Sequence, residues 1–136
     1  MALPTETGRR AGLKSRHGFT LIELLVVMAI IATLLMIAVP RYFHSLEKAK
    51  EATLRQDLAV MRDAIDKYFG DSGQYPQQLA ELVDRRYLRS LPVDPLTKSA
   101  ESWVAVDSQD PELPGITDIH SGAEGQSSGG TPYNEY

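Results

Sequence analysis

Glu23 is the only charged side chain in an apolar run that extends from Phe19 to Val39. A carboxylate is costly to place in lipid, so a charge inside such a run indicates a function. The run begins directly after Gly18, and a basic segment precedes that glycine. A buried carboxylate attracts a cation strongly, and either charge alone is expensive to bury. The start of this run is therefore the first place where the chain could do chemistry.

The run 19–39 is long enough to cross a membrane. Its 21 residues are interrupted only by Thr20, Glu23 and Thr33, and a helix of this length spans roughly 31 Å. An ordinary signal peptide fits poorly, because the apolar region is too long and no small-residue cleavage pattern follows it. A simple one-pass anchor explains the length and leaves Glu23 without a role. Four basic residues precede the run and four lie in the sixteen residues after it, so charge does not decide the orientation.

The segment Arg16-His17-Gly18-Phe19-Thr20-Leu21-Ile22-Glu23-Leu24 resembles the class III signal of type IV pilins and type II secretion pseudopilins. The resemblance implies that a prepilin peptidase removes a basic leader, residues 1–18, by cutting between Gly18 and Phe19. It also implies that the new amine of Phe19 is methylated. Glu23 could then pair with its own amine, four residues away, or with that of a neighbouring subunit, which is the assembly role that the resemblance implies. Snorkelling of Glu23 to the interface is the alternative.

Residues 40–70 are expected to continue the helix as an amphipathic second half. A stripe at intervals of four and three predicts a buried face, and it consists of Leu54, Leu58, Met61, Ile65 and Tyr68. Tyr42, Leu46 and Ala49 fit the same period. Pro40 removes one backbone hydrogen bond and predicts a kink. Gly70 and the following Asp71-Ser72-Gly73 predict the end of the helix.

The charged residues of this second half are interpreted as a solvated or subunit-facing surface. They are Glu47, Lys48, Lys50, Glu51, Arg55, Arg62, Asp63 and Asp66.

Residues 71–136 are expected to form a small α/β domain. A short helix is predicted for Pro76–Asp84, with Leu79, Leu82 and Val83 facing inward, and strands are predicted for Trp103–Val106 and Ile116–His120. Leu91-Pro92-Val93-Asp94-Pro95 is a rigid turn because it holds two prolines. Residues 121–136 are Gly- and Ser-rich and should be loop.

This C-terminal half is similar to the major, G-type pseudopilin of type II secretion. The matching pieces are Gly73-Gln74-Tyr75-Pro76, Leu91-Pro92-x-Asp94-Pro95 and Asp118-Ile119-His120-Ser121-Gly122-Ala123-Glu124-Gly125. The resemblance implies a pilin-like α+β fold, in which a long N-terminal helix packs on a small domain with a short helix and a small antiparallel sheet. It implies a structural subunit of a periplasmic pseudopilus that helps to export folded proteins.

The same resemblance implies the partners and the location. The chain would start in the bacterial inner membrane as a single-pass protein with a periplasmic C-terminal domain. It would then polymerise with copies of itself and with minor pseudopilins, on an inner-membrane assembly platform served by an ATPase. A type IV pilin of a surface pilus, for adhesion or motility, is the nearest alternative, but the absence of cysteine disfavours it. A membrane-anchored binding module that never polymerises is the alternative from another class.

The resemblance also implies calcium in the last loop. Glu124 stands where the family pattern has an aspartate, and Asp118 is close in sequence. A second acidic residue deeper in the loop is missing until Glu135, although calcium favours several carboxylates among its six to eight oxygens. The other interpretation is a Gly-rich loop held by its own hydrogen bonds and by packing of Tyr133 or Tyr136 on a neighbour.

Charge and motifs argue against nucleic-acid binding and catalysis. Residues 1–18 hold four basic and one acidic residue, a net charge of +3, and the rest holds ten basic and seventeen acidic, a net charge of −7. So acidic a domain offers no face to neutralise phosphates. His17, His44 and His120 are far apart in sequence, and no nucleophile or phosphate-binding motif is present. The chain is expected to be the substrate of an enzyme and not an enzyme.

Replacing Glu23 by Ala should leave membrane insertion intact and cripple assembly, because the pairing partner of the terminal amine is lost. Crosslinking of membranes measures this as a ladder of oligomers that requires Glu23. An Ala variant that polymerises normally would show that the pairing hypothesis is wrong.

Overall fold

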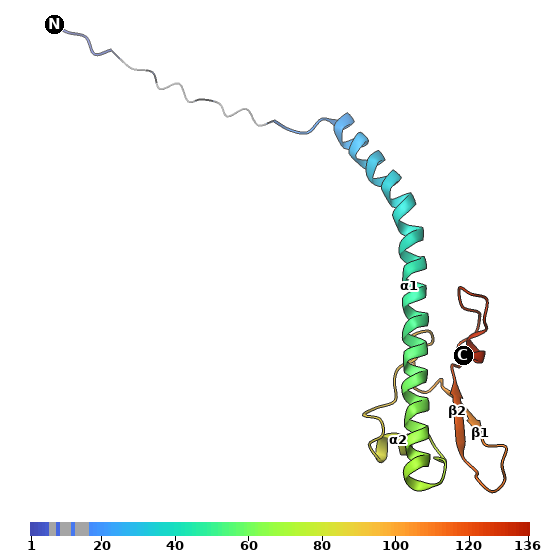
Figure 1. Cartoon of the computed structure of the whole chain (residues 1–136). Coiled ribbons are helices and arrows are strands. Elements are labelled where there is room, and N and C mark those ends of the chain that lie inside the picture. Colours follow the sequence, from blue (N-terminus) through green and yellow to red (C-terminus); the bar gives the residue numbers. More distant parts are fainter. Residues whose placement is uncertain (6–7, 9–11, 13–16) are drawn as a thin grey trace. The chain divides into compact units, whose positions relative to one another are not determined.

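The computed structural model describes residues 1–5, 8, 12 and 17–136. Much of the predicted leader, including its basic residues, lies outside the described residues. The elements are α1 (Leu21–Ser72), α2 (Ala80–Asp84), β1 (Val104–Asp107), β2 (Ile116–His120) and the 3₁₀ helix η1 (Tyr133–Glu135), as Figure 1 shows. Two compact units are present, residues 1–39 and 40–136, and the long helix contributes to both. This is the α+β, pilin-like arrangement that the sequence predicted.

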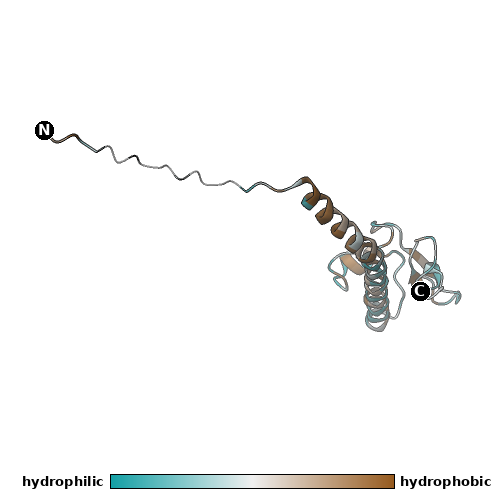
Figure 2. Ribbon diagram, turned by 90° about the horizontal axis from the view of Figure 1, so that it is seen from above, coloured by the Kyte–Doolittle hydropathy of each residue, from teal (hydrophilic) through white to brown (hydrophobic). Residues whose placement is uncertain are grey.

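The first unit contains the apolar half of α1. Its large apolar side chains are exposed in the isolated chain, from Leu21 at 80% to Val39 at 43%, and Figure 2 shows this half in brown, the hydrophobic end of its scale. Among the described residues, α1 is the one helix long and apolar enough to cross a membrane. Exposed apolar surface of this extent requires a cover, which lipid or other protein supplies.

The second half of α1 supplies much of the core of the second unit. The predicted stripe is confirmed, because all five of its side chains are at most 4% exposed. They pack with residues from the rest of the unit, namely Leu82, Leu88, Trp103, Ile116, Ile119 and Tyr133. The earlier residues of the same period do not join this core, since Tyr42 is 65% and Leu46 is 37% exposed.

The helix continues two residues beyond the predicted end at Gly70. Gly73 adopts a left-handed φ of 69°, and its N–H donates to the Phe69 carbonyl at 2.8 Å. This is the glycine C-cap geometry, which closes a helix by satisfying one of its last carbonyls. Gly73, which adopts the left-handed conformation, therefore ends the helix, and Gly70 lies inside it.

Helix α2 is shorter than predicted and begins at Ala80 instead of Pro76. The Pro76 carbonyl accepts a hydrogen bond from the Ile116 N–H at 2.8 Å, so that carbonyl is held by β2 and does not start a helix. The inward-facing prediction is confirmed in that Leu82 is fully buried and Leu79 and Val83 are partly buried.

Strands β1 and β2 form a two-stranded antiparallel sheet in which Val104 pairs with His120 and Ala105 with Ile119. Strand β1 is shifted by one residue from the predicted Trp103–Val106, whereas β2 matches the prediction. Trp103 is instead a core residue, 7% exposed, and its indole N–H donates to the Pro92 carbonyl at 2.8 Å. The rigid proline turn is thereby fixed to the sheet.

Replacing Leu58 by Ala should destabilise the second unit by about 2–5 kcal/mol, because it leaves a cavity between α1 and the rest of the core. Denaturant unfolding of the full chain in detergent measures this through Trp103, the only tryptophan. Leu46→Ala on the same helix is the matched control and should have a small effect, since Leu46 is 37% exposed. Equal losses for the two variants would contradict the described core.

Candidate processing and assembly site

The predicted cleavage junction lies just before α1, in backbone without regular structure. Phe19 is 90% exposed. A Cβ atom added to Gly18 would meet nothing within 4 Å. The fold of this chain therefore does not require a glycine at position 18, and any such requirement comes from what binds the junction.

Glu23 lies in the first turn of α1. Its backbone N–H donates to the Thr20 hydroxyl oxygen at 3.2 Å, which makes Thr20 the N-cap. Thr and Glu three residues apart form the capping-box pattern, which is visible in the sequence and marks the start of a helix. A carboxylate is also favoured here by the positive end of the helix dipole. Glu23 therefore lies in the capped first turn of α1, four residues after Phe19, and Phe19 itself precedes the helix.

Pro40 lies inside the continuous helix α1. Because proline has no N–H, the carbonyl four residues earlier, at Met36, loses its helical donor. The kink itself stays a prediction.

Glu51 fastens the C-terminal loop to α1. The Ser128 N–H donates to one Glu51 carboxylate oxygen at 2.6 Å, and the Ser128 hydroxyl donates to the other at 2.9 Å. Glu51 is only 6% exposed. The backbone hydrogen bond from Ser128 lowers the pKa of Glu51; burial opposes this shift, and the Ser128 hydroxyl and the Arg55 charge add to it. The interpretation of Glu51 as a surface residue was wrong.

Arg62 makes the second connection between α1 and the end of the chain. Its guanidinium donates to the Asp118 carboxylate at 2.7 Å, to the Ile119 carbonyl at 3.0 Å and to the Tyr136 main-chain oxygen at 2.6 Å. The His120 ring also contacts that Tyr136 oxygen, at 2.8 Å. Arg62 was likewise interpreted as a surface residue, and a 3.6-residue period cannot show which charged positions meet a partner from elsewhere in the chain.

Asp94 is the buried centre of the proline turn. It is fully buried, and its carboxylate accepts hydrogen bonds from the Leu96 and Thr97 N–H groups and from the Ser121 hydroxyl. An aspartate that accepts from backbone two and three residues later is a common turn device. The Ser121 contact joins this turn to the first residue of the C-terminal loop.

The two residues expected to bind calcium have different surroundings. Asp118 is paired with Arg62, and the Ile119 N–H donates to the same carboxylate oxygen at 2.7 Å. Burial raises the pKa of Asp118, and the Ile119 N–H and the Arg62 guanidinium outweigh it, so that the pKa is lowered. Glu124 is exposed. The described residues hold no cluster of three or more His, Cys, Asp or Glu able to hold a metal.

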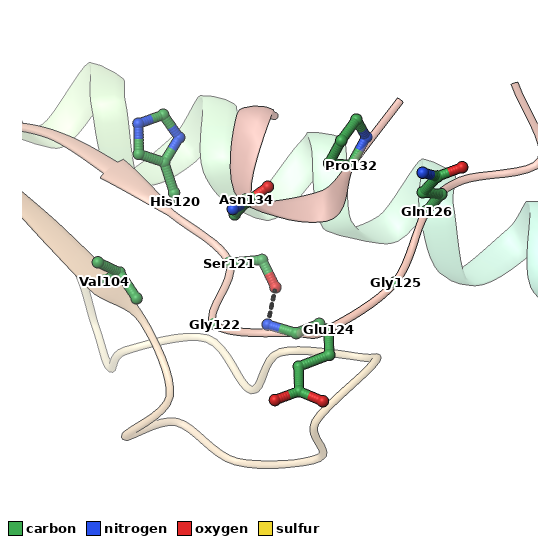
Figure 3. A pocket seen from close by; sticks show the side chains of 10 residues that line it. Val104, His120, Ser121, Gly122, Glu124, Gly125, Gln126, Pro132 and Asn134 are labelled. Atoms are coloured by element: carbon green, nitrogen blue, oxygen red, sulfur yellow. Dashed lines mark hydrogen bonds between the residues drawn. The ribbon is translucent and has the colours of Figure 1, made fainter. Parts of the chain in front are cut away.

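Glu124 instead lines an open cavity of about 690 Å³ beside the end of β2. Figure 3 shows this cavity, with His120, Gln126 and Asn134 around it and the Glu124 carboxylate extending away from the His120 ring. The backbone of Ala123 is held there by the Ser121 hydroxyl at 3.1 Å. A single carboxylate among amides and glycines does not supply the several charged oxygens that calcium favours.

Comparisons with known proteins agree on one family. Residues 13–39 match the model of the prokaryotic N-terminal methylation motif. The chain is 32% identical over 99 residues to the type II secretion system core protein G of Klebsiella pneumoniae, which covers 61% of this chain and 71% of that protein. It is 34% identical over 96 residues to core protein G of Escherichia coli K12, with 59% and 66% covered.

A longer match covers most of both chains. Core protein G of Vibrio cholerae is 29% identical over 133 residues, which is 86% of this chain and 87% of that protein. No solved structure matches the chain.

Replacing Arg62 by Lys should lower the stability of the second unit by about 1–2 kcal/mol, because an ammonium cannot reproduce the fork that reaches three oxygens. The loss is small because the Arg62 and Asp118 side chains are 37% and 40% exposed, so water screens part of their attraction. Thermal unfolding of the full chain in detergent measures the change. Arg89→Lys, at an exposed position, is the matched control, and an Arg62→Lys melting temperature equal to that of the control would contradict the assignment.

Proposed function

The chain belongs to the type IV pilin-like family of type II secretion system core protein G, the major pseudopilins, and from this membership we propose how it works as a pseudopilus subunit. Its role is structural: copies polymerise through the apolar half of α1 and help to export folded proteins. The match to the N-terminal methylation motif and the names of the relatives support this role.

The observation that carries the proposal is the apolar half of α1. None of its most hydrophobic 18-residue window is buried by the described part of the chain. The surface that covers it therefore has to come from lipid or from other subunits. A bilayer covers it before assembly, and the same helices of neighbouring subunits cover it in a filament. Burying apolar surface stabilises a protein by about 25 cal/mol per Å². The apolar half of α1 is therefore more stable in the bilayer or in the filament than exposed to water.

Processing at the Gly18–Phe19 bond prepares this transfer. A prepilin peptidase cuts an exposed junction that the fold leaves accessible, and Phe19 is then methylated. The match to the N-terminal methylation motif over residues 13–39 supports this step.

Glu23 would use the amine that cleavage creates. The Thr20 cap fixes Glu23 in the first turn of α1, four residues after Phe19. A pair between Glu23 of one subunit and the Phe19 amine of the next would neutralise two charges in a low-dielectric filament interior. The same pair would set the axial register between subunits.

Location and partners follow from the proposed role. The precursor would sit in the inner membrane with residues 40–136 in the periplasm. Minor pseudopilins, the assembly platform and its ATPase would take part in polymerisation. The names of the relatives favour this secretion role over that of a surface type IV pilin.

Replacing Gly18 by Val should block processing, so that the membrane-bound chain keeps its leader and lacks the methyl group on Phe19. Intact-mass measurement of the purified chain distinguishes the two forms. Gly12→Val is the matched control, because a Cβ at either glycine would meet nothing within 4 Å. Processing of the Gly18→Val chain at the same bond, or an unprocessed natural chain in cells with the peptidase, would refute the assigned junction.

A further inference from the structure

The C-terminal loop, residues 121–136, is tied to the proline turn at its start and to α1 in its middle and at its end. Asp94 accepts from the Ser121 hydroxyl at the start of the loop. Glu51 accepts from Ser128 in the middle, and Arg62 donates to the Tyr136 main-chain oxygen at the end. Because Glu51 and Arg62 lie on one helix, the loop is held against a rigid element.

The loop also has internal hydrogen bonds that shape its middle into a tight turn. The Ser127 N–H donates to the Thr131 carbonyl at 2.8 Å, and the Gly130 N–H donates to the Ser127 carbonyl at 2.9 Å. The Thr131 N–H donates to the Ser127 hydroxyl at 3.2 Å. This turn points the N–H and hydroxyl of the next residue, Ser128, at the same carboxylate, so Glu51 receives two donors from a single residue.

We propose that this loop is fixed by a protein-only clasp, in which Glu51 binds Ser128 and Arg62 binds Tyr136, and that the clasp takes the place of the calcium ion that the resemblance implied for this loop. In the clasp, the buried Glu51 carboxylate accepts hydrogen bonds from two donors of the loop, the Ser128 N–H and hydroxyl. A calcium ion would instead need oxygen atoms of the loop that can coordinate it. Hydrogen bonds to an ionised carboxylate, such as the two that Glu51 accepts from Ser128, are among the stronger polar contacts in proteins.

The two residues that the resemblance offered for calcium support the same conclusion. The guanidinium of Arg62 lies 2.7 Å from the Asp118 carboxylate, so its positive charge occupies the place that a cation would take and repels another one. Glu124 lies in the open cavity beside β2 without a second carboxylate among the lining residues. The donors and charges of this loop therefore match the clasp and not a calcium site.

The clasp makes the loop independent of calcium and dependent on α1. The test uses the full chain in detergent micelles, in millimolar calcium and in excess chelator. Thermal unfolding is followed by Trp103 fluorescence, and hydrogen exchange is followed in peptides that cover residues 121–136. The natural chain should show the same melting temperature and the same loop exchange in both conditions.

Two variants with the same chemical change separate the explanations. Glu51→Gln should lower the melting temperature and speed exchange of the loop by about tenfold in both conditions, as expected for the loss of a charge-assisted hydrogen bond. Glu124→Gln should match the natural chain in both. Ser128→Ala removes only the hydroxyl contact and should show a smaller increase in exchange, which keeps the test usable where Glu51→Gln does not fold.

Calcium that raises the melting temperature of the natural chain, with Glu124→Gln removing that gain, would overturn the proposal. Loop exchange in Glu51→Gln or Ser128→Ala that equals that of Glu124→Gln would overturn it as well. Neither readout depends on polymerisation, so its outcome is separate from that of the proposed pseudopilus role.

Discussion

Helix α1 has to satisfy two different environments in its two halves. Its first half is apolar on all sides and finds no cover within the chain, whereas its second half buries one stripe and leaves the other faces polar. The small second unit depends on that stripe, because α2 and a two-stranded sheet are too little to enclose a core by themselves. The helix is therefore the structural support of the domain and also the part that leaves it unfinished without lipid or neighbouring subunits.

Charged residues on α1 do as much to place the rest of the chain as the apolar ones. Glu51 and Arg62 each use their charge on a segment more than fifty residues away in sequence. Both residues also bind backbone groups: Arg62 donates to the Ile119 and Tyr136 main-chain oxygens, and Glu51 accepts from the Ser128 N–H. These contacts therefore position the backbone of the distant segments and not only their side chains. Hydrogen bonds are directional, whereas the apolar packing of Leu58 or Met61 is not. The contacts of Glu51 and Arg62 therefore help to fix the orientation of the sheet and the loop on the second half of α1.

The parts of the fold set by local periodicity could be predicted from the sequence. The five-residue stripe, β2 and the apolar run of α1 all came from spacing alone, and the capping pattern of Thr20 and Glu23 was available in the same way. The ends of elements were harder: α2 starts late because β2 takes the Pro76 carbonyl. The partners of Glu51 and Arg62 could not be predicted, since a charged residue on a helix looks the same in sequence whether it faces water or a distant loop. Gly18, Phe19 and Glu23 could be singled out only because their motif is specific.

The contacts of Tyr136 have a consequence for how the domain folds. Arg55 donates to its hydroxyl from 81 residues away, and Arg62 contacts its main-chain oxygen from 74 residues away. Contacts of such long range close late, because a large loop of chain must be ordered before they form. The second half of α1 is synthesised before the residues that cover its apolar stripe, which lie between Leu82 and Tyr133, and the stripe is uncovered until they are ordered. The folding of this small domain thus depends on segments far along the chain from α1, and a chain in which α1 is helical before those segments are ordered is the species most exposed to premature association.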